Sequence, residues 1–459
     1  MNTNCPVDSV LSLIGNTPMV QIRAIDTGPC ELYVKLENQN PGGSIKDRMA
    51  LAMIEAAEKS GALKPGGTIV EATAGNTGLG LALVASQKGY KLVLVIPDKM
   101  SQEKIFHLRA MGAQVVLTRS DVGHGHPEYY MDLAHTIAEQ RGAYYVNQFG
   151  NPANPLAHEQ STGPEIWEQM GHKLDAVVLG VGSGGTLTGL SNYFSKTAPH
   201  VEMILADPMG SILADMAMNR KKGPDGNYLV EGIGGSFLPP VGDLSRVKAA
   251  YTITDAETFE TARELLKKEG ILGGSSAGTL VAAALRYCRA QTKSKRVVTF
   301  ICDSGNKYLS KMYNDYWMID QGFIQRESFG DLRDLIARRH WENATVTIGP
   351  DDQIQAAYRR MKLYEVSQLP VLDADGKVVG ILDESDLLAK LMDDANAFNL
   401  PVKSAMVEDV QTLELTSPID ALIPVFKQGR VAVVVDHGKF LGLITQMDLI
   451  HFRRRKTAL

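Results

Sequence analysis

The segment DAVVLGVGSGGTLTG, residues 175–189, decides the fold class of this chain. It opens with a continuous apolar run rich in β-branched residues, which is typical of a strand buried on both faces of a parallel sheet. A glycine-rich stretch follows and then gives way to residues that favour a helix, which predicts a tight strand-to-helix turn. A buried strand joined to a helix in this way is the building unit of α/β folds.

Similar apolar runs recur along the chain and alternate with helical patterns. The other runs are 31–37, 68–73, 91–97, 113–118, 143–148, 201–207 and 296–302. Helical patterns cover 47–61, 77–89 and 101–112. This alternation predicts parallel sheets that bind ligands at the carboxyl ends of their strands. Because the strands are too many for one mononucleotide-binding unit, we expect two α/β subdomains that flank a cleft.

An internal repeat occupies the C-terminal part of the chain. LPVLDADGKVVGILDESDLL (369–388) aligns with VAVVVDHGKFLGLITQMDLI (431–450) at a constant offset of 62 residues. Each copy predicts a strand, a glycine turn, a second strand and a helix opened by an aspartate. We therefore expect an α+β pair of small domains after the α/β part. The expected boundaries are 1–325 for the α/β part, 326–335 for a linker, and 336–395 and 396–459 for the two small domains.

Composition excludes several classes of protein. Of the 459 residues, 44% are hydrophobic and 22% are charged, which excludes a largely disordered or fibrous chain. A net charge of −5 argues against non-specific nucleic-acid binding. No apolar run is long enough for a membrane span, and the first residues lack the pattern of a signal peptide. The 4 cysteines form no CxxC pair and fit a reducing cytoplasm. His124 and His126 lack further ligands at suitable spacing, so we expect no metal site.

Lys46 lies in NQNPGGSIKDR (38–48), where a Pro-Gly-Gly turn leads into a predicted helix. The macrodipole disfavours a cation in the first turn of a helix, so this position and any burial both lower the pKa of the lysine. A neutral amine is what a Schiff-base nucleophile requires. A surface lysine after a turn is the alternative, and composition alone favours it.

Three more turns resemble ligand cradles. EATAGNTGLG (71–80) places hydroxyls and Asn76 at a helix N-terminus, where a carboxylate can bind, although a capping asparagine explains the pattern as well. GVGSGGTLTG (180–189) would close backbone amides around a phosphate, with the Thr186 hydroxyl added. EGILGGSSAGT (269–279) presents Ser276, whose hydroxyl could bond a ring nitrogen without protonating it, or simply cap a helix.

A dinucleotide site is the competing interpretation of the third turn. Gly180, Gly182 and Gly185 match GxGxxG, and Asp207 ends the next strand, where a ribose partner would lie. An NAD-dependent dehydrogenase is therefore a second hypothesis, and a non-catalytic ligand sensor is another. The four turns together supply a phosphate pocket, a carboxylate pocket, a lysine and a neutral partner for a heteroaromatic nitrogen. Pyridoxal 5′-phosphate needs all of these, whereas NAD has no use for the lysine.

Seven motifs occur in the order found in the β-family, or fold type II, of pyridoxal-phosphate enzymes. They are GGSIKDR, TAGNTG, QFGNPANPLAH, GVGSGGT, VEGIG, GGSSAG and CDSGNKY. The resemblance covers residues 8 to about 325 and implies the two-subdomain, tryptophan synthase β-like fold. The repeat resembles the tandem CBS domains of the Bateman module, which cysteine synthases generally lack. That tail, Glu231 in VEGIG and WMIDQGF (317–323) together favour the cystathionine β-synthases over the cysteine synthases.

The resemblance implies a pyridoxal-phosphate-dependent lyase that condenses L-serine with L-homocysteine to L-cystathionine and water, in the route from homocysteine to cysteine. Hydrogen sulfide would be a side product, and the cytoplasmic enzyme would be a homodimer or larger homo-oligomer. A cysteine synthase of the O-acetylserine sulfhydrylase type is the alternative. Gly235 and Ser236 stand where related synthases often carry Tyr and Asp, and Ala74 where Ser is common, so the preferred thiol acceptor stays open.

The resemblance also assigns residues to the cofactor and the substrate. Lys46 would bond covalently to the cofactor and later move protons at the substrate Cα, Asn76 would bond the phenolic oxygen, and Ser276 would face the pyridine nitrogen. The phosphate would be held by Gly182, Ser183, Gly184, Gly185 and Thr186. The substrate carboxylate would be held by Thr73, Ala74, Asn76, Thr77 and Gln148.

Two further expectations concern ligands outside this site. The match begins at about residue 8 and leaves no counterpart of the haem-binding leader of animal synthases, so we expect no haem despite Cys5. Thr445 and Asp448 match the ribose-contacting motif of CBS domains, whereas Asp383 replaces the threonine in the first copy. This predicts at most one good adenosyl site, for S-adenosylmethionine or a similar ligand. A module that only assembles the protein is the alternative.

Overall fold

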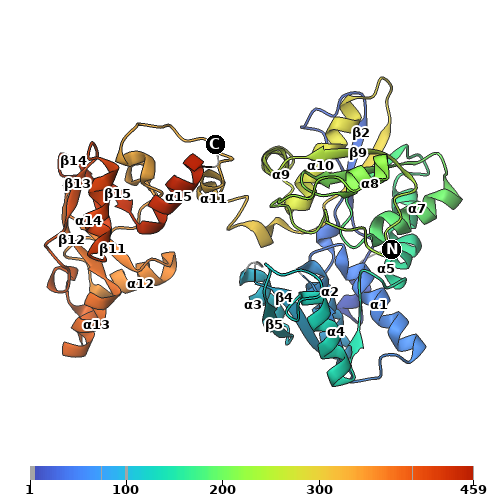
Figure 1. Ribbon diagram of the computed structural model, residues 1–459, viewed down its shortest axis with the longest axis horizontal. Helices are drawn as coiled ribbons and strands as arrows, with labels where there is room; N and C mark the ends of the chain where they lie inside the picture. Colours follow the sequence, from blue (N-terminus) through green and yellow to red (C-terminus); the bar gives the residue numbers. More distant parts are fainter. Residues whose placement is uncertain (1–5, 74, 99–101, 395, 458–459) are drawn as a thin grey trace. The chain divides into compact units, whose positions relative to one another are not determined.

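The computed structural model describes residues 6–73, 75–98, 102–394 and 396–457. The chain divides into two compact units, Met1–Tyr313 and Asn314–Leu459 (Figure 1). The first unit contains two open, mostly parallel sheets, each with its own hydrophobic core. The second unit contains the two copies of the repeat. The predicted fold class, a two-subdomain α/β fold followed by a pair of α+β domains, is therefore confirmed.

The larger sheet of the first unit has the strand order β1-β2-β10-β7-β8-β9, and only β1 runs antiparallel to its neighbour. Its strands are β1 (Met19–Gln21), β2 (Glu31–Lys35), β7 (Ala176–Leu179), β8 (Glu202–Pro208), β9 (Val247–Ile253) and β10 (Arg296–Phe300). All four residues of β7 are buried, as the continuous apolar run at 175–182 predicts. The edge strands β1 and β9 were not predicted. Each has only one neighbouring strand and is mostly half-buried, so neither carries a continuous apolar run.

The smaller sheet is entirely parallel, with the order β5-β4-β3-β6. Its strands are β3 (Thr68–Ala72), β4 (Lys91–Pro97), β5 (Gln114–Thr118) and β6 (Tyr144–Tyr145). The central strand β4 is buried from Leu92 to Pro97. The predicted strand at 143–148 shrinks to two residues, because the chain leaves the sheet edge there to form the turn that carries Gln148.

Helices cover the faces of both sheets (Figure 1). They are α1 (Lys46–Ser60), α2 (Asn76–Lys88), α3 (Gln102–Ala110), α4 (Tyr130–Arg141), α5 (Ala153–Ala157), α6 (Gly163–Gln169), α7 (Gly185–Thr197), α8 (Leu213–Asn219), α9 (Asp255–Glu269) and α10 (Ser275–Arg289). Four of them begin at the turns singled out in the sequence, namely α1, α2, α7 and α10. Helix N-termini carry unpaired N–H groups and a partial positive charge, so these four turns are positioned to bind polar groups.

The second unit begins with α11 (Asp315–Asp320) and contains two similar halves. The first half comprises α12 (Ile354–Tyr364), β11 (Gln368–Leu372), β12 (Val378–Asp383) and α13 (Glu384–Asp393). The second comprises β13 (Thr412–Glu414), α14 (Leu422–Lys427), β14 (Ala432–Asp436), β15 (Lys439–Ile444) and α15 (Gln446–Thr457). The matched glycines Gly376 and Gly438 both adopt positive φ at hairpin turns, of 78° and 81°. The repeat in the sequence is therefore a repeat in structure.

Within the described ranges, no helix combines the length and the apolar character needed to cross a membrane.

Candidate active site

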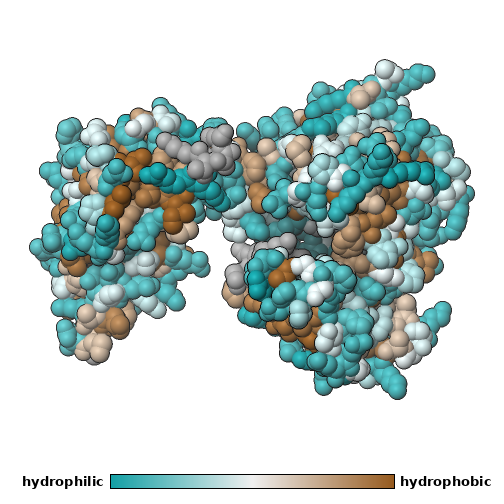
Figure 2. Space-filling model, in the orientation of Figure 1, coloured by the Kyte–Doolittle hydropathy of each residue, from teal (hydrophilic) through white to brown (hydrophobic). Residues whose placement is uncertain are grey.

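The four turns surround one cavity of about 700 Å³ in the first unit. In the space-filling view this unit is hollowed between its two lobes (Figure 2). Most residues predicted for the cofactor and substrate line the cavity: Lys46, Thr73, Asn76, Thr77, Gln148, Gly182, Ser183, Gly184, Thr186 and Ser276. Gly185 is the first residue of α7, between two of them. Ala74 lies outside the described residues. The structure therefore brings together segments that are up to about 230 residues apart in the chain.

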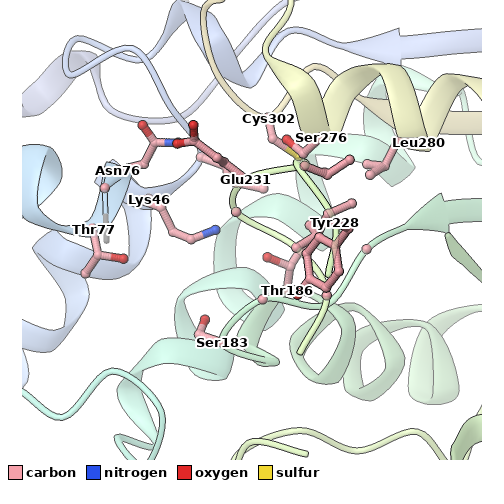
Figure 3. A pocket seen from close by; sticks show the side chains of 18 of the residues that line it. Lys46, Asn76, Thr77, Ser183, Thr186, Tyr228, Glu231, Ser276, Leu280 and Cys302 are labelled. Carbon is pink, nitrogen blue, oxygen red and sulfur yellow. The ribbon is translucent and has the colours of Figure 1, made fainter. Parts of the chain in front are cut away.

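Lys46 is the first residue of α1, as the turn before it predicts. Figure 3 shows its side chain reaching into the cavity between Asn76 and Thr186. Its Nζ makes no hydrogen bond or ion pair to any other residue that the structure describes. Enclosure by the cavity walls lowers the pKa of Lys46, and the acidic groups Asp303 and Glu37 offset this only in part. The amine is therefore unengaged and biased toward its neutral, nucleophilic form.

A network of buried charged side chains holds the start of α1 in place. Two residues after Lys46, the guanidinium of Arg48 donates to Glu37 at 2.8 Å and to Glu165 at 2.7 Å. Lys35 lies 3.0 Å from the same Glu165 carboxylate. A buried charge pair is costly to break by removing one partner, so this network fixes the direction in which α1 begins. Nothing in the sequence pattern predicted it, because its members come from three separate segments.

The turn before α2 and the turn after β6 meet at one wall of the cavity. The Thr77 hydroxyl donates to the side-chain oxygen of Gln148 at 2.7 Å. The amide of Gln148 donates in turn to the Ala72 carbonyl at 3.2 Å. Thr73 accepts the N–H of Gly75 at 3.2 Å. These polar groups are adjacent at the N-terminus of α2, which is an arrangement suited to a carboxylate.

The glycine turn before α7 is shaped by the absence of side chains. Gly184 has φ of 89°, and a Cβ there would lie 2.7 Å from the Cα of Gly242. A Cβ on Gly182 would overlap the carbonyl of Gly232, and one on Gly185 would overlap the side chain of Asn154. α7 has no side-chain cap at its N-terminus. The turn is therefore a close-fitting backbone cradle with free helical N–H groups, which suits a phosphate.

Two buried side chains brace this cradle. Asn154 donates to the Ser183 hydroxyl at 3.0 Å, and Nε2 of His158 lies 3.3 Å from the Thr186 hydroxyl. Burial, with help from the charge of Arg48, lowers the pKa of His158 to about 3. The imidazole is therefore neutral and acts as a hydrogen-bond partner rather than as a charge. Both hydroxyls of the cradle are thus held by the segment that follows Gln148.

Ser276 lines the cavity beside Cys302, at the start of α10 (Figure 3). The hydroxyl of Ser275, the preceding residue, is engaged by the N–H of Glu231 at 2.9 Å. Burial raises the pKa of the Cys302 thiol to about 12, so this group is neutral. Ser276 therefore presents a hydroxyl, with no charged acid beside it, to this side of the cavity.

Sequence reasoning missed a charged cluster at the same cavity, formed by Lys104, Glu231 and Lys311. Glu231 accepts from Lys104 in a short contact and from Lys311 at 2.7 Å. Burial alone would raise the pKa of Glu231, but the two lysines together lower it. Lys104 also lies 4.9 Å from the ring centroid of Tyr308, a cation–π distance. Lys104 sits inside an ordinary helical pattern, so no local signal marked it, and Glu231 was noticed only as part of a family motif.

Glu71, which contacts Gln148 in the same cavity wall, makes the stability of the protein depend on pH. Its carboxylate is buried and accepts N–H groups of Ala72 at 3.0 Å and Gln148 at 3.2 Å. Burial raises the pKa of Glu71 from 4.5 to about 8, and these hydrogen bonds oppose the shift. Between those pH values the folded chain binds a proton that the unfolded chain has lost, so stability falls as pH rises.

We therefore expect Glu71→Gln, the uncharged isostere, to change how the stability depends on pH. Relative to the wild type, the variant should gain stability as pH rises from 4.5 to about 8, by about 1.4 kcal/mol per pH unit. Thermal unfolding of both proteins at several pH values measures this. Parallel curves across the range would show that Glu71 does not titrate as described.

The geometry does not favour a dinucleotide site. The carboxylate of Asp207, the expected ribose partner, accepts the N–H of Ala214 at 2.8 Å and so caps α8. Asp207 is not among the residues that line the cavity.

His124 contacts Asp132 on the surface at 3.1 Å. In the part of the chain that the structure describes, no cluster of three or more His, Cys, Asp or Glu side chains could hold a metal ion.

Comparison with known proteins agrees with this geometry. The family model described as "Pyridoxal-phosphate dependent enzyme" matches residues 10–303, and the CBS domain model matches 341–393 and 402–455. A hydrogen sulfide-producing enzyme from Fusobacterium nucleatum is 40% identical with a TM-score of 0.62, covering 66% of this chain and 100% of its own. O-ureido-L-serine synthase is 35% identical with a TM-score of 0.63, covering 69% of this chain and 100% of its own. The fold and the site thus define a pyridoxal-phosphate-dependent enzyme.

Relatives that match nearly the whole chain identify its family more precisely. The cystathionine beta-synthase of Oryctolagus cuniculus is 35% identical over 96% of this chain and 84% of the relative. That of Dictyostelium discoideum is 34% identical over 97% and 92%, and that of Saccharomyces cerevisiae 33% over 97% of both. The chain belongs to the cystathionine beta-synthase family of pyridoxal-phosphate-dependent lyases.

The residues present fit this cofactor. A free, enclosed amine, a glycine cradle too tight for any Cβ and a neutral hydroxyl lie around one cavity. These are the groups that an aldehyde, a phosphate and a pyridine nitrogen require, respectively. NAD would leave the amine without a role, so the dehydrogenase hypothesis is not supported.

Proposed function

We propose that this chain condenses L-serine with L-homocysteine to give L-cystathionine and water, and that it releases hydrogen sulfide as a side activity. The near full-length likeness to cystathionine beta-synthases, tail included, carries this proposal. The likeness to a solved hydrogen sulfide-producing enzyme supports the side activity. The proposed setting is the cytoplasm, with the chain as a homodimer, for which a molar mass from sedimentation is the test.

The positions of the side chains support the proposed roles. Lys46 would hold the cofactor aldehyde through Nζ and, as a neutral amine, would accept the Cα proton of the substrate. Bound pyridoxal phosphate supplies a conjugated ring that delocalises the electron pair left at Cα. Ser276 would offer a hydroxyl to the ring nitrogen without protonating it, which would keep that electron sink weak and favour loss of the β-hydroxyl.

The other predicted residues bind and orient. The 182–186 turn holds the phosphate through backbone N–H groups and the hydroxyls of Ser183 and Thr186. Asn76 donates to the phenolic oxygen. The substrate carboxylate lies against Thr73, Thr77 and Gln148 at the N-terminus of α2, together with Ala74, which lies outside the described residues. Remote groups of this kind place the Cα proton within reach of Lys46.

The charged cluster of Lys104, Glu231 and Lys311 favours an amino-acid acceptor over sulfide. A free amino acid carries one ammonium and one carboxylate, and the cluster offers a partner for each. Sulfide has neither group and gains nothing from such a cluster. This observation supports homocysteine over the sulfide used by a cysteine synthase.

Paired assays test the proposal. The purified protein should form cystathionine from serine and homocysteine faster than it forms cysteine from O-acetylserine and sulfide. Glu231→Gln should raise the KM for homocysteine more than the KM for sulfide, because only the amino acid engages the cluster. A preference for O-acetylserine and sulfide would instead identify a cysteine synthase.

The C-terminal module is proposed to bind an adenosyl ligand such as S-adenosylmethionine at Thr445 and Asp448. At the start of α15, the Thr445 hydroxyl donates to the Asp448 carboxylate at 2.7 Å. This leaves the second carboxylate oxygen available for a ribose hydroxyl. In the first copy Asp383 forms a capping box with Asp386 instead, which offers no hydroxyl. Calorimetry should show heat with S-adenosylmethionine that is lost in Asp448→Ala; no heat with the wild type would leave the module an assembly unit.

A further inference from the structure

Lys307 belongs to a hydrogen-bonded network at one wall of the cavity, and the proposed function gives it no role. Its Nζ donates to the side-chain oxygen of Asn76 at 2.8 Å and approaches the Gly43 carbonyl at 3.3 Å. The side-chain nitrogen of Asn76 donates to Asp303 at 2.8 Å. Tyr308 donates to the same oxygen of Asp303 at 2.9 Å. Asp303 and Tyr308 are both buried, and Tyr308 also lines the cavity.

This network permits only one orientation of the Asn76 amide. An amide has one oxygen that accepts and one nitrogen that donates two hydrogens, and the two ends have nearly the same shape. A lysine can only donate, so the oxygen must face Lys307. A carboxylate can only accept, so the nitrogen must face Asp303. With one N–H bound to Asp303, the amide keeps its second N–H free, while its oxygen is engaged by Lys307.

We propose that Lys307 is a positioning residue that locks Asn76 as a hydrogen-bond donor toward the phenolic oxygen of the cofactor. The inference rests on the proposed role of Asn76. A donor at that oxygen stabilises its anionic form, whereas an acceptor would stabilise the protonated, neutral form. Lys307 acts through Asn76 and touches neither cofactor nor substrate.

The orientation of the Asn76 amide should affect the absorption spectrum of the bound cofactor. Pyridoxal phosphate bound to a lysine absorbs visible light when its phenolic oxygen is anionic and near-ultraviolet light when that oxygen is protonated. Without Lys307 the amide can rotate and offer its oxygen to the cofactor. The equilibrium between the two forms should then move toward the near-ultraviolet form.

The test compares absorption spectra of the enzyme with its cofactor bound. In Lys307→Met the ratio of visible to near-ultraviolet absorbance should fall about fivefold, the change expected for one net hydrogen bond. Lys307→Arg, which also can only donate, should restore most of the ratio. Lys307→Gln should behave like the methionine variant while keeping a polar side chain for folding, since its own carbonyl and amide allow either orientation of Asn76. Lys196→Met, at an exposed ion pair, is the matched control and should leave the ratio unchanged.

A double-mutant cycle separates positioning from general support of the fold. If Lys307 acts through Asn76, then Lys307→Met should change nothing further in an Asn76→Ala background. An unchanged spectrum in both Lys307→Met and Lys307→Gln, or an equal shift in the Asn76→Ala background, would overturn the inference. Failure of the wild type to make cystathionine would overturn the proposed function alone, because the spectra require only bound cofactor.

Discussion

Lys46→Ala is expected to lower the rate of cystathionine formation by at least ~10³-fold, the range over which a positioned acid or base contributes. The reason is that its amine lies free in the cavity, with a lowered pKa and at the start of a helix. Steady-state assays with serine and homocysteine measure the effect. The variant should also lose the visible band of a lysine-bound cofactor.

The matched control for this prediction is Lys59→Ala. Lys59 lies in the last turn of the same helix and is exposed, so its removal tests the loss of a lysine from α1 without touching the cavity. Its activity should equal that of the wild type. Near-normal turnover by the Lys46 variant would mean that another group performs the proton transfer.

Gly184→Ala is expected to weaken binding of pyridoxal phosphate by about 100-fold. Alanine is disfavoured at positive φ by ~1–2 kcal/mol, and pushing a methyl group into packed backbone adds ~1–3 kcal/mol. The turn can relieve both only by moving away from Gly242, which opens the cradle. Titration of the apoenzyme with the cofactor, followed by absorbance, gives the affinity.

Gly270→Ala separates backbone strain from damage to the cradle. Gly270 caps the C-terminus of α9 with φ of 71°, and a Cβ there meets nothing within 4 Å. It should therefore lose some stability and keep its affinity for the cofactor. Equal affinities in the two alanine variants would show that the 182–186 turn does not hold the phosphate.

The fold could be predicted from the sequence wherever burial is reflected in local pattern. Strands such as β4 and β7, which are enclosed on both faces, consist of continuous apolar runs. The repeat is visible in the sequence as matched glycines and aspartates. Edge strands such as β9 carry a mixed pattern and were missed. Their pairing is decided by a neighbour distant in the chain, which a local pattern does not record.

The site could likewise be predicted only where its residues lie in a local sequence pattern. Glycine turns before Asn76, Gly185 and Ser276 revealed where helices begin, because turn chemistry is local. Partners that meet only through tertiary structure left no such signal. Lys104 reads as an ordinary helical lysine, although it pairs with Glu231 from a segment about 127 residues away. Lys307 lies in a quoted motif, yet its contact with Asn76 became visible only in three dimensions.

Reduction of the enzyme with borohydride, followed by peptide mass mapping, identifies the amine that holds the cofactor. Borohydride fixes the cofactor to whichever amine holds it, and three other lysines, Lys104, Lys307 and Lys311, lie at or beside the same cavity. We expect one phosphopyridoxyl group per chain, attached to Lys46. Attachment to any other lysine, or no attachment at all, would contradict it.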